Sequence, residues 1–274
     1  QFIIMKYFLS SLFSCFLFSA SAQSHLLVRE WETDTVVAIP ESVLLHNDKL
    51  YVSLIDGAPW EDDGKGGIAV MKKGGAEYNG NWVTGLSAPK GMAVSGNKLY
   101  VADITRVAVI DMKKGTIIKI IPVPGSQNLN DITIGRGVVY VSDSKAGKIW
   151  QIKNNKPEVY LDNTPAVNGL KFIDNELYYG EGVNFKRINK QKKISTVAVL
   201  PKGIDGIEQL ASGDFIVSSW PGYIFYVYAN GKYETLLETH QQKINTADIG
   251  IDKLNNIIYV PTFFGKRVVA YQVK

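Results

Sequence analysis

One short strand sequence recurs six times along this chain of 274 residues. Each copy consists mainly of β-branched, aromatic and leucine residues, with Ser or Ala at the fourth position of four copies, and is bounded by glycine- or asparagine-containing turns. The second residues of successive copies are 49, 40, 38, 38 and 43 positions apart. A period near 40 residues made of short strands is typical of propeller blades, and no long window has helical periodicity. The copies are residues 50–53, 99–102, 139–142, 177–179, 215–218 and 258–260.

Each repeat unit accommodates four strands, so we predict an all-β fold, a six-bladed β-propeller. In the second unit the expected strands are 91–95, 99–102, 107–111 and 116–122, with hairpin turns between them. The sixth unit reaches the C-terminus after its third strand, 267–273, and lacks an outer strand. Segment 26–33 alternates like a strand and precedes the first unit. We expect it to complete the last blade, which would remove an exposed sheet edge.

The N-terminal residues have the pattern of a secretory signal peptide. Lys6 precedes an apolar run over 7–18, and Ala20 and Ala22 frame a small-residue cleavage site. The apolar run is too short for a membrane span. We therefore expect residues 1–22 to be a leader with its upstream residues, 23–274 to be one propeller domain, and the protein to be secreted or periplasmic. Cys15, the only cysteine, lies in the leader, so thiol chemistry is not expected in the mature chain.

Oxygen-bearing side chains open the innermost strand of four repeat units. Equivalent positions on innermost strands meet around the axis of a propeller, so these side chains are expected to converge. Two carboxylates and two amides favour a hard cation such as Ca²⁺, with Mg²⁺, Mn²⁺ or Zn²⁺ as alternatives. Asn, Asp and Gly before a strand are also ordinary turn formers, and that interpretation stays open. The aligned openings are Glu41-Ser42-Val43, Lys90-Gly91-Met92, Asn130-Asp131-Ile132, Asn168-Gly169-Leu170, Asp205-Gly206-Ile207 and Ala247-Asp248-Ile249.

These residues carry a family resemblance. Segment 40–43, followed by 49–52, resembles the opening blade of the regucalcin/gluconolactonase (senescence marker protein) family. The order Glu41, Asn130, Asn168, Asp205 is similar to the metal ligands of that family and of diisopropylfluorophosphatase. The repeats also resemble bacterial NHL-type propellers. These are called gluconolactonase-like, but the name does not establish that they have the activity. The resemblance covers the six repeats and implies a divalent-metal-dependent hydrolase of lactones or related esters.

The resemblance also implies roles for individual residues. Asp205 would be both a metal ligand and the general base, while the metal would polarise the substrate carbonyl. Asp131 and Asp248 occupy the next position in their units. They are expected either to orient water or the groups that hold the metal ligands in place, or to cap backbone amides, and both interpretations stay open.

The loops at the same end of the channel are predicted to form the rim of a pocket. The first is enlarged, over 56–67, and is placed to act as a lid. Aromatic side chains with isolated charges suit a small polar organic ligand such as a lactone, although the aromatics could equally fill space between blades. Histidine is scarce, so no catalytic histidine pair is expected. The predicted rim residues are Trp60, Arg106, Trp220, Phe263 and His240.

Three functional classes follow from this pattern. The first is a metal-dependent lactonase or esterase, and the second is a non-catalytic propeller that binds a protein, a glycan or a small ligand. A scaffold that uses metal for stability is the third. The formal net charge of +4 comes largely from lysines in turns rather than from a basic stripe, so no nucleic-acid partner is expected.

Overall fold

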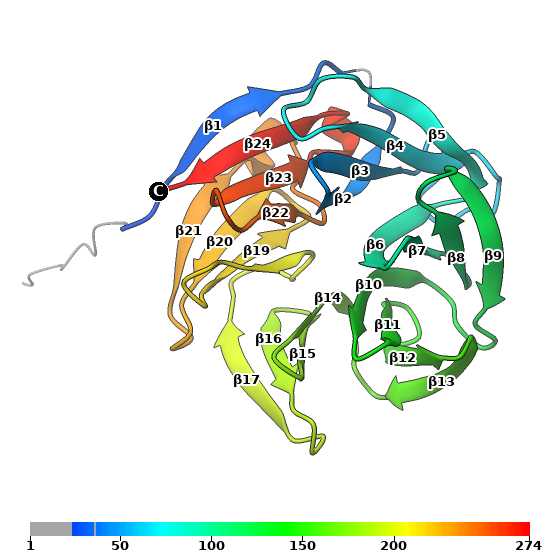
Figure 1. The fold of residues 1–274 in the computed structure, drawn as a ribbon. Helices are drawn as coiled ribbons and strands as arrows, with labels where there is room; N and C mark the ends of the chain where they lie inside the picture. Colours follow the sequence, from blue (N-terminus) through cyan, green and yellow to red (C-terminus); the bar gives the residue numbers. More distant parts are fainter. Residues whose placement is uncertain (1–23, 36) are drawn as a thin grey trace, which may run out of the picture.

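The computed structural model describes residues 24–35 and 37–274. Their strands form six four-stranded antiparallel sheets arranged as a ring (Figure 1). The predicted six-bladed β-propeller is confirmed. The predicted leader and Cys15 lie outside the described residues. In the part of the chain that is described, neither short helix has the length and hydrophobicity needed to cross a bilayer.

Each blade is a meander in which consecutive strands run from the channel to the periphery. The first blade contains β2 (Pro40–His46), β3 (Lys49–Leu54), β4 (Gly66–Lys72) and β5 (Asn79–Leu86). The second contains β6 (Pro89–Ser95), β7 (Lys98–Asp103), β8 (Arg106–Asp111) and β9 (Thr116–Pro122). The third contains β10 (Leu129–Gly135), β11 (Val138–Asp143), β12 (Lys148–Lys153) and β13 (Lys156–Leu161).

The remaining blades follow the same plan. The fourth contains β14 (Val167–Ile173), β15 (Glu176–Glu181), β16 (Asn184–Ile188) and β17 (Ile194–Val199). The fifth contains β18 (Ile207–Gln209), β19 (Phe215–Ser219), β20 (Tyr223–Val227) and β21 (Tyr233–Glu238). The sixth contains β22 (Gly250–Asp252), β23 (Ile257–Pro261), β24 (Val268–Val273) and β1 (Leu27–Glu32). Two short 3-10 helices, η1 (His240–Gln242) and η2 (Phe263–Gly265), lie in loops.

The ring closes as the sequence predicts, with β1 as the outer strand of the sixth blade. Leu27 pairs with Val273 and Glu32 with Val269 in an antiparallel ladder. A second closure lies at the channel, where Val43 N donates to Asp248 O and Asp248 N donates to Glu41 O. The innermost strand of the first blade is thereby joined to the segment that leads into the innermost strand of the last. The first and last blades are therefore joined at the channel, while β1 covers the edge of β24 at the periphery.

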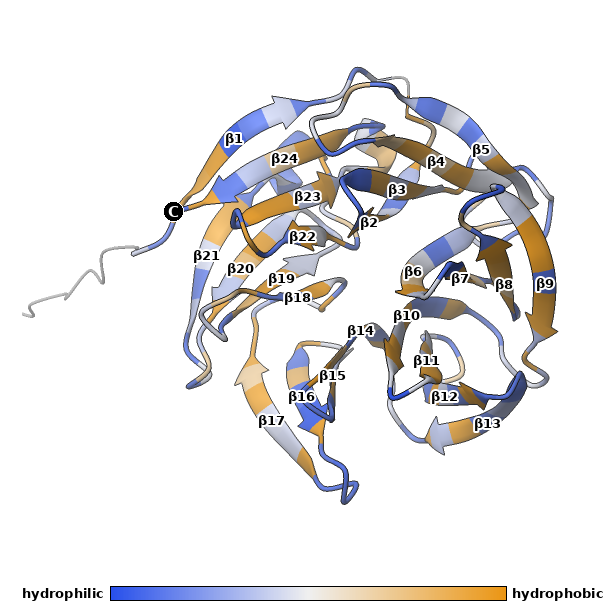
Figure 2. Ribbon diagram, in the orientation of Figure 1, coloured by the Kyte–Doolittle hydropathy of each residue, from blue (hydrophilic) through white to orange (hydrophobic). Residues whose placement is uncertain are grey.

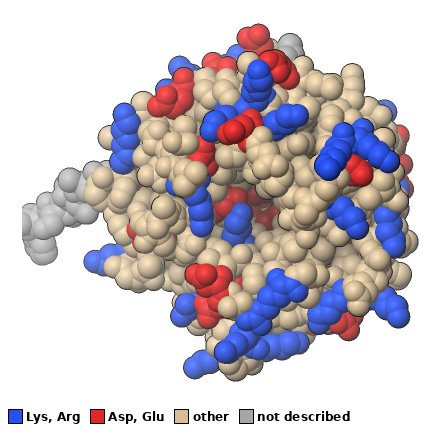
Figure 3. Space-filling model, viewed as in Figure 1, with Lys and Arg blue, Asp and Glu red and all other residues tan. Residues whose placement is uncertain are grey.

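The hydrophobic core lies between the faces of neighbouring blades. One cluster joins Ile68 and Val83 of the first blade to Leu99 and Val101 of the second. Middle strands are sandwiched on both faces, so β8 is apolar between its charged end residues, Arg106 and Asp111, whereas β1 and β5 mix hydrophilic and hydrophobic residues (Figure 2). The innermost strands line the channel. It forms a central hollow that contains acidic and basic side chains (Figure 3).

Candidate functional site

Three of the predicted ring residues, Glu41, Asn130 and Asn168, lie at β-bulges in the innermost strands, whereas the fourth, Asp205, precedes β18. In the third blade, Leu129 pairs with Asp143 and Ile132 pairs with Val141, so β10 has one more residue than its partner over this stretch. The first, second and fourth blades have register shifts at the equivalent positions. A bulge leaves a residue outside the regular ladder and re-aims its side chain. These bulges explain how a ring of polar side chains can come from strands that are otherwise regular.

Serines of the repeated strand sequence support this region in three blades. The serine at the fourth position of the repeat lies on the second strand of its blade. Its hydroxyl oxygen accepts a hydrogen bond from a backbone N–H beside the ring position. This bond satisfies a buried donor that the interrupted ladder leaves without a partner. The contacts join Ser42 N to Ser53 Oγ at 2.9 Å, Asp131 N to Ser142 Oγ at 2.9 Å and Gly206 N to Ser218 Oγ at 2.8 Å.

The structure brings all four predicted ligands to one cavity of about 450 Å³. Three predicted rim residues line the same cavity. Pro59, Lys90 and Phe264, which the sequence analysis did not assign to the site, line it as well. Five polar side chains therefore face five apolar ones. The predicted residues in the cavity are Glu41, Asn130, Asn168, Asp205, Trp60, Trp220 and Phe263.

Three oxygen atoms of the predicted ligands are buried without a hydrogen-bond partner among the described residues. They are Glu41 Oε2, Asn168 Oδ1 and Asp205 Oδ2. Asn168 Nδ2 donates to Asp205 Oδ1 at 2.5 Å, which leaves Asn168 Oδ1 and Asp205 Oδ2 available. Asn130 Nδ2 donates to Ser144 Oγ at 3.0 Å. Buried polar atoms are usually satisfied, so three unpartnered oxygens that line one cavity point to a bound group.

This donor set fits a hard divalent cation. The side chains offer carboxylate and amide oxygens, which Ca²⁺ prefers, and no sulfur or imidazole ligand. Within residues 24–35 and 37–274, no group of three or more His, Cys, Asp and Glu is arranged to hold a metal. A cation here would therefore depend on the amides of Asn130 and Asn168 as well as on the two carboxylates.

Burial dominates the electrostatics of the cavity. It raises the pKa of Glu41 to about 8, while the Lys90 ammonium opposes the rise. Burial also raises the pKa of Asp205 to about 6, against the lowering effects of the Asn168 hydrogen bond and of Lys90. The pKa of Lys90 is lowered by its own burial, and Glu41 and Asp205 partly compensate. A charged ligand or ion bound beside these groups would therefore shift their pKa values again.

Aromatic side chains form one wall of the cavity. The rings of Trp220 and Phe263 meet edge to face with centroids 5.5 Å apart, and Phe264 lies 6.1 Å from Trp220. Trp60, from the enlarged first loop, lies over Lys90 with its ring centroid 4.4 Å from Nζ. The loop thus contributes directly to the cavity, at the place predicted for a lid.

Two predicted rim residues lie elsewhere. Arg106 does not line the cavity. Its Nε donates to Asp103 at 2.9 Å and its Nη2 lies 3.3 Å from Asp62, so it ties the first loop to the second blade. His240 does not line the cavity either and stacks on Tyr223 with centroids 4.8 Å apart. Ion pairing of Arg106 and ring stacking of His240 account for the position of both side chains outside the cavity.

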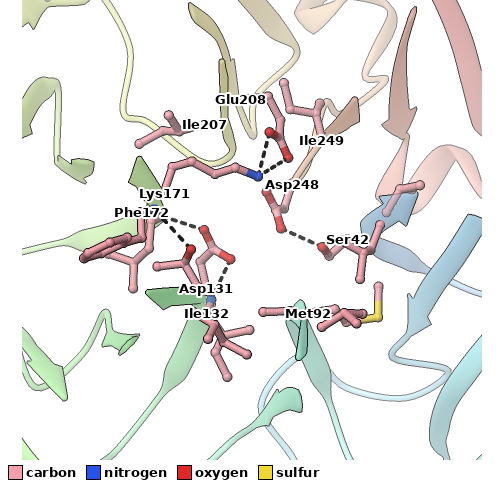
Figure 4. Close-up of a pocket in the computed structure, with 17 residues that line it drawn as sticks. Ser42, Met92, Asp131, Ile132, Lys171, Phe172, Ile207, Glu208, Asp248 and Ile249 are labelled. Atoms are coloured by element: carbon pink, nitrogen blue, oxygen red, sulfur yellow. Dashed lines mark hydrogen bonds and ion pairs between the residues drawn. The ribbon is translucent and has the colours of Figure 1, made fainter. Parts of the chain in front are cut away.

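Asp131 and Asp248 line a separate chamber of about 220 Å³ further along the channel (Figure 4). Asp131 accepts backbone N–H groups of Ile132 and Leu170, at 2.6 and 2.5 Å, so its hydrogen bonds are of the backbone-capping kind. Asp248 Oδ2 accepts the Ser42 hydroxyl at 2.6 Å. Burial raises the pKa of Asp131 well above its usual range and that of Asp248 to about 7.

The same chamber holds an ion pair that the sequence analysis missed. Lys171 Nζ lies 2.6 Å from Glu208 Oε2 and 2.7 Å from Glu208 Oε1 (Figure 4). The two residues occupy equivalent positions in the fourth and fifth blades, two places beyond the glycines of the aligned triplets. Aligning a fourth residue of each innermost strand would have brought them together.

Comparisons with known proteins show the fold. No protein family matches the sequence, and no curated protein matches it. Among solved structures, a streptogramin B lyase is 13% identical, with a TM-score of 0.66 over 91% of this chain and 98% of the other. A gluconolactonase-like protein is 11% identical, with a TM-score of 0.67 over 92% and 93%. A chain from a nidogen/laminin complex is 16% identical, with a TM-score of 0.67 over 78% and 85%. Neighbours of such different kinds, at such low identity, share the fold and leave activity to be argued from the site.

Proposed function

We propose that this protein is a divalent-metal-dependent hydrolase of lactones or related esters, with Ca²⁺ as the favoured ion. The observation that supports this most strongly is the set of three unpartnered, buried oxygens on Glu41, Asn168 and Asp205, all lining one cavity. Asn130 supplies a further amide at the same cavity. These four side chains would hold the ion, and the remaining coordination positions would be open to water or substrate.

When bound, the ion would supply Lewis-acid polarisation of the substrate carbonyl. The protein's own residues would do the rest. Asp205 Oδ2 would accept a proton from the attacking water and so act as the general base. The hydrogen bond from Asn168 holds Oδ1 and so orients Oδ2. Trp60, Trp220 and Phe263 would enclose the substrate and reduce its contact with water.

The test uses purified protein, a panel of γ- and δ-lactones and of short esters, and a chelator. We expect turnover that is lost on chelation, restored by added Ca²⁺ and abolished by Asp205→Asn. Asp162→Asn, at an exposed position outside the cavity, is the matched control and should keep full activity. Turnover that resists chelation, or no turnover when calorimetry shows that Ca²⁺ is bound, would refute the proposal.

A non-catalytic binding function is the second candidate. The aromatic surface at the cavity mouth favours it, because Trp60, Trp220 and Phe264 are 39%, 41% and 58% exposed. Exposed aromatic clusters commonly form ligand-binding or protein-binding surfaces. Saturable binding to this surface without turnover of any lactone or ester would favour this candidate over the hydrolase.

A further inference from the structure

Lys90 is the buried cation of the cavity. It occupies the ring position of the second blade, at the bulge between Pro89 and Met92, and is only 2% exposed. Lysine is among the residues least often buried, because removing its ammonium from water is costly unless a partner compensates. Its position is equivalent to those of the four predicted ligands, yet its charge is opposite to that of a metal ligand. A role other than metal coordination is therefore required.

The ammonium group lacks the hydrogen bonds that would normally compensate its burial. Its nearest ionic partner is Glu41, with Oε1 3.9 Å from Nζ, which is beyond hydrogen-bond distance. The rings of Trp60 and Phe263 lie 4.4 and 5.9 Å from Nζ. No hydrogen bond joins Nζ to any residue that the structure describes. An ammonium carries three donors, so this group faces the cavity with its donors available.

We propose that Lys90 recognises a carboxylate, or a comparable singly charged anionic group, on the ligand of this cavity. The inference rests on the proposed function, because it names the substrate class of the same site: lactones or esters that carry an acidic substituent. A carboxylate oxygen within hydrogen-bond distance of Nζ would supply the acceptor that the protein does not, and such charge-assisted bonds are among the strongest in proteins.

The charge balance of the cavity supports an anionic ligand. Glu41 and Asp205 contribute two negative charges and Lys90 one positive charge when all three are ionised. A divalent cation held by these residues would change the local net charge from −1 to +1. One singly charged anion then neutralises the site, whereas a neutral ligand leaves a buried charge uncompensated.

The volume and the lining of the cavity constrain the size and polarity of the part of the ligand that adjoins the anionic group. A volume of about 450 Å³ accommodates a small molecule rather than a polymer chain. Trp60 and Phe263 lie beside the ammonium, so an apolar ring or chain adjoining the carboxylate would contact them. A five- or six-membered ring with an acidic substituent meets both requirements.

The test measures binding separately from turnover. The probes are a tetrahydrofuran ring that bears a carboxylate and the same ring with a neutral carboxamide, neither of which has a lactone bond to hydrolyse. Affinities are measured by calorimetry and by tryptophan fluorescence, because Trp60 adjoins Lys90, with Ca²⁺ and with chelator. The variants are Lys90→Met, Lys90→Gln as a second neutral change should the first fail to fold, and Lys90→Arg to restore the charge. Lys202→Met is the matched control, since Lys202 lies over Tyr223 at 5.2 Å and outside the cavity.

We expect the unaltered protein to bind the carboxylate at least about tenfold more tightly than the carboxamide, as is typical for a hydrogen bond to a charged group. Both neutral variants should lose this preference, Lys90→Arg should keep part of it, and the control should keep all of it. Equal affinities in the unaltered protein, undetectable binding of the carboxylate, or a preference that survives in Lys90→Met would overturn the inference. A Lys90-dependent preference without hydrolysis of any lactone would reject the hydrolase alone.

Discussion

Asn168 Nδ2 donates a hydrogen bond to Asp205 Oδ1 at 2.5 Å, across the boundary between the fourth and fifth blades. The contact joins two residues that lie 37 positions apart and equivalent in their repeats. It uses one polar atom of each side chain and leaves the carbonyl oxygen of Asn168 and one carboxylate oxygen of Asp205 unpartnered. A single interblade hydrogen bond thus prepares two oxygens for one ligand.

Replacing Asn168 should therefore weaken cation binding in two ways. Asn168→Ala removes one oxygen donor and also releases the Asp205 carboxylate from its orientation. Loss of a group that orients a metal ligand commonly costs about tenfold to a hundredfold in affinity, so we expect a reduction of at least that size for Ca²⁺. Isothermal titration calorimetry measures the effect, and the exposed Asn81→Ala on β5 serves as the control. Unchanged Ca²⁺ affinity in Asn168→Ala would remove this residue from the site.

The stability of the metal-free protein should fall as the pH rises. Burial raises the pKa of Glu41 from 4.5 to about 8, so the folded chain keeps a proton that the unfolded chain has released. The associated stability is fully present below about pH 4.5 and is lost as the pH rises through about 8. Asp205 and Asp248, with pKa values raised to about 6 and about 7, act in the same direction.

Thermal unfolding in chelator at several pH values between 4.5 and 8 measures this dependence. Glu41→Gln should show a shallower decrease in Tm with pH, while Glu238→Gln, at an exposed position on β21, should match the unaltered protein. Added Ca²⁺ should raise Tm most at the alkaline end, because it binds the ionised carboxylates. A Tm that increases with pH in the absence of metal would contradict the raised pKa values.

Asp143 should be essential for stability. It is fully buried, and its carboxylate accepts N–H groups of Gln127, Asn128 and Ala146 at 2.9–3.0 Å. These bonds fix the segment that leads into β10, which carries Asn130. Asp143→Ala leaves buried donors unpaired, so the free energy of unfolding should fall by about 3 kcal/mol or more. Chemical denaturation measures the loss. Asp162→Ala, whose carboxylate is half exposed, should change it little, and equal effects of both variants would contradict this account.

Gly169 should tolerate no side chain. A Cβ at this position would lie 2.1 Å from the backbone oxygen of Asp205, so the fourth and fifth blades would have to separate. Gly169→Ala should lower the free energy of unfolding by about 1–3 kcal/mol or more and should weaken Ca²⁺ binding, because Asp205 moves. Gly74→Ala is the matched control, since nothing lies within 4 Å of its Cβ position. A Gly169→Ala protein with unaltered stability and Ca²⁺ affinity would be inconsistent with this packing.

Local sequence patterns were sufficient to predict the blades. In the second unit the predicted strands at 99–102 and 116–122 correspond to β7 (Lys98–Asp103) and β9 (Thr116–Pro122). Hairpins bring together residues close in sequence, and a constant repeat length extends the same pairing around the ring. The convergence of Glu41, Asn130, Asn168 and Asp205 on one cavity could be anticipated for the same reason, because symmetry relates equivalent positions.

Side-chain direction in the loops could not be predicted in this way. Arg106 occupies the loop end where a rim residue was expected, but Asp103 and Asp62 hold its guanidinium outside the cavity. Lys90 opens the aligned triplet of the second unit, at the position that the predicted ligands occupy in the other units, but no role was predicted for it. Trp60, which lies over its ammonium, belongs to the loop between β3 and β4, and that loop is longer than the equivalent loop of every other blade.

The sequence by itself determined the six repeats, the closing role of β1 and the oxygen-rich ring, because each depends on short-range pairing multiplied by an approximate symmetry. Only the tertiary structure decided which atoms of that ring are left unpartnered, that a buried ammonium lies among them, and that Asp131 and Asp248 belong to a second chamber. Those outcomes depend on contacts between different blades and on the depth of burial. Neither quantity is encoded in the spacing of residues along the chain.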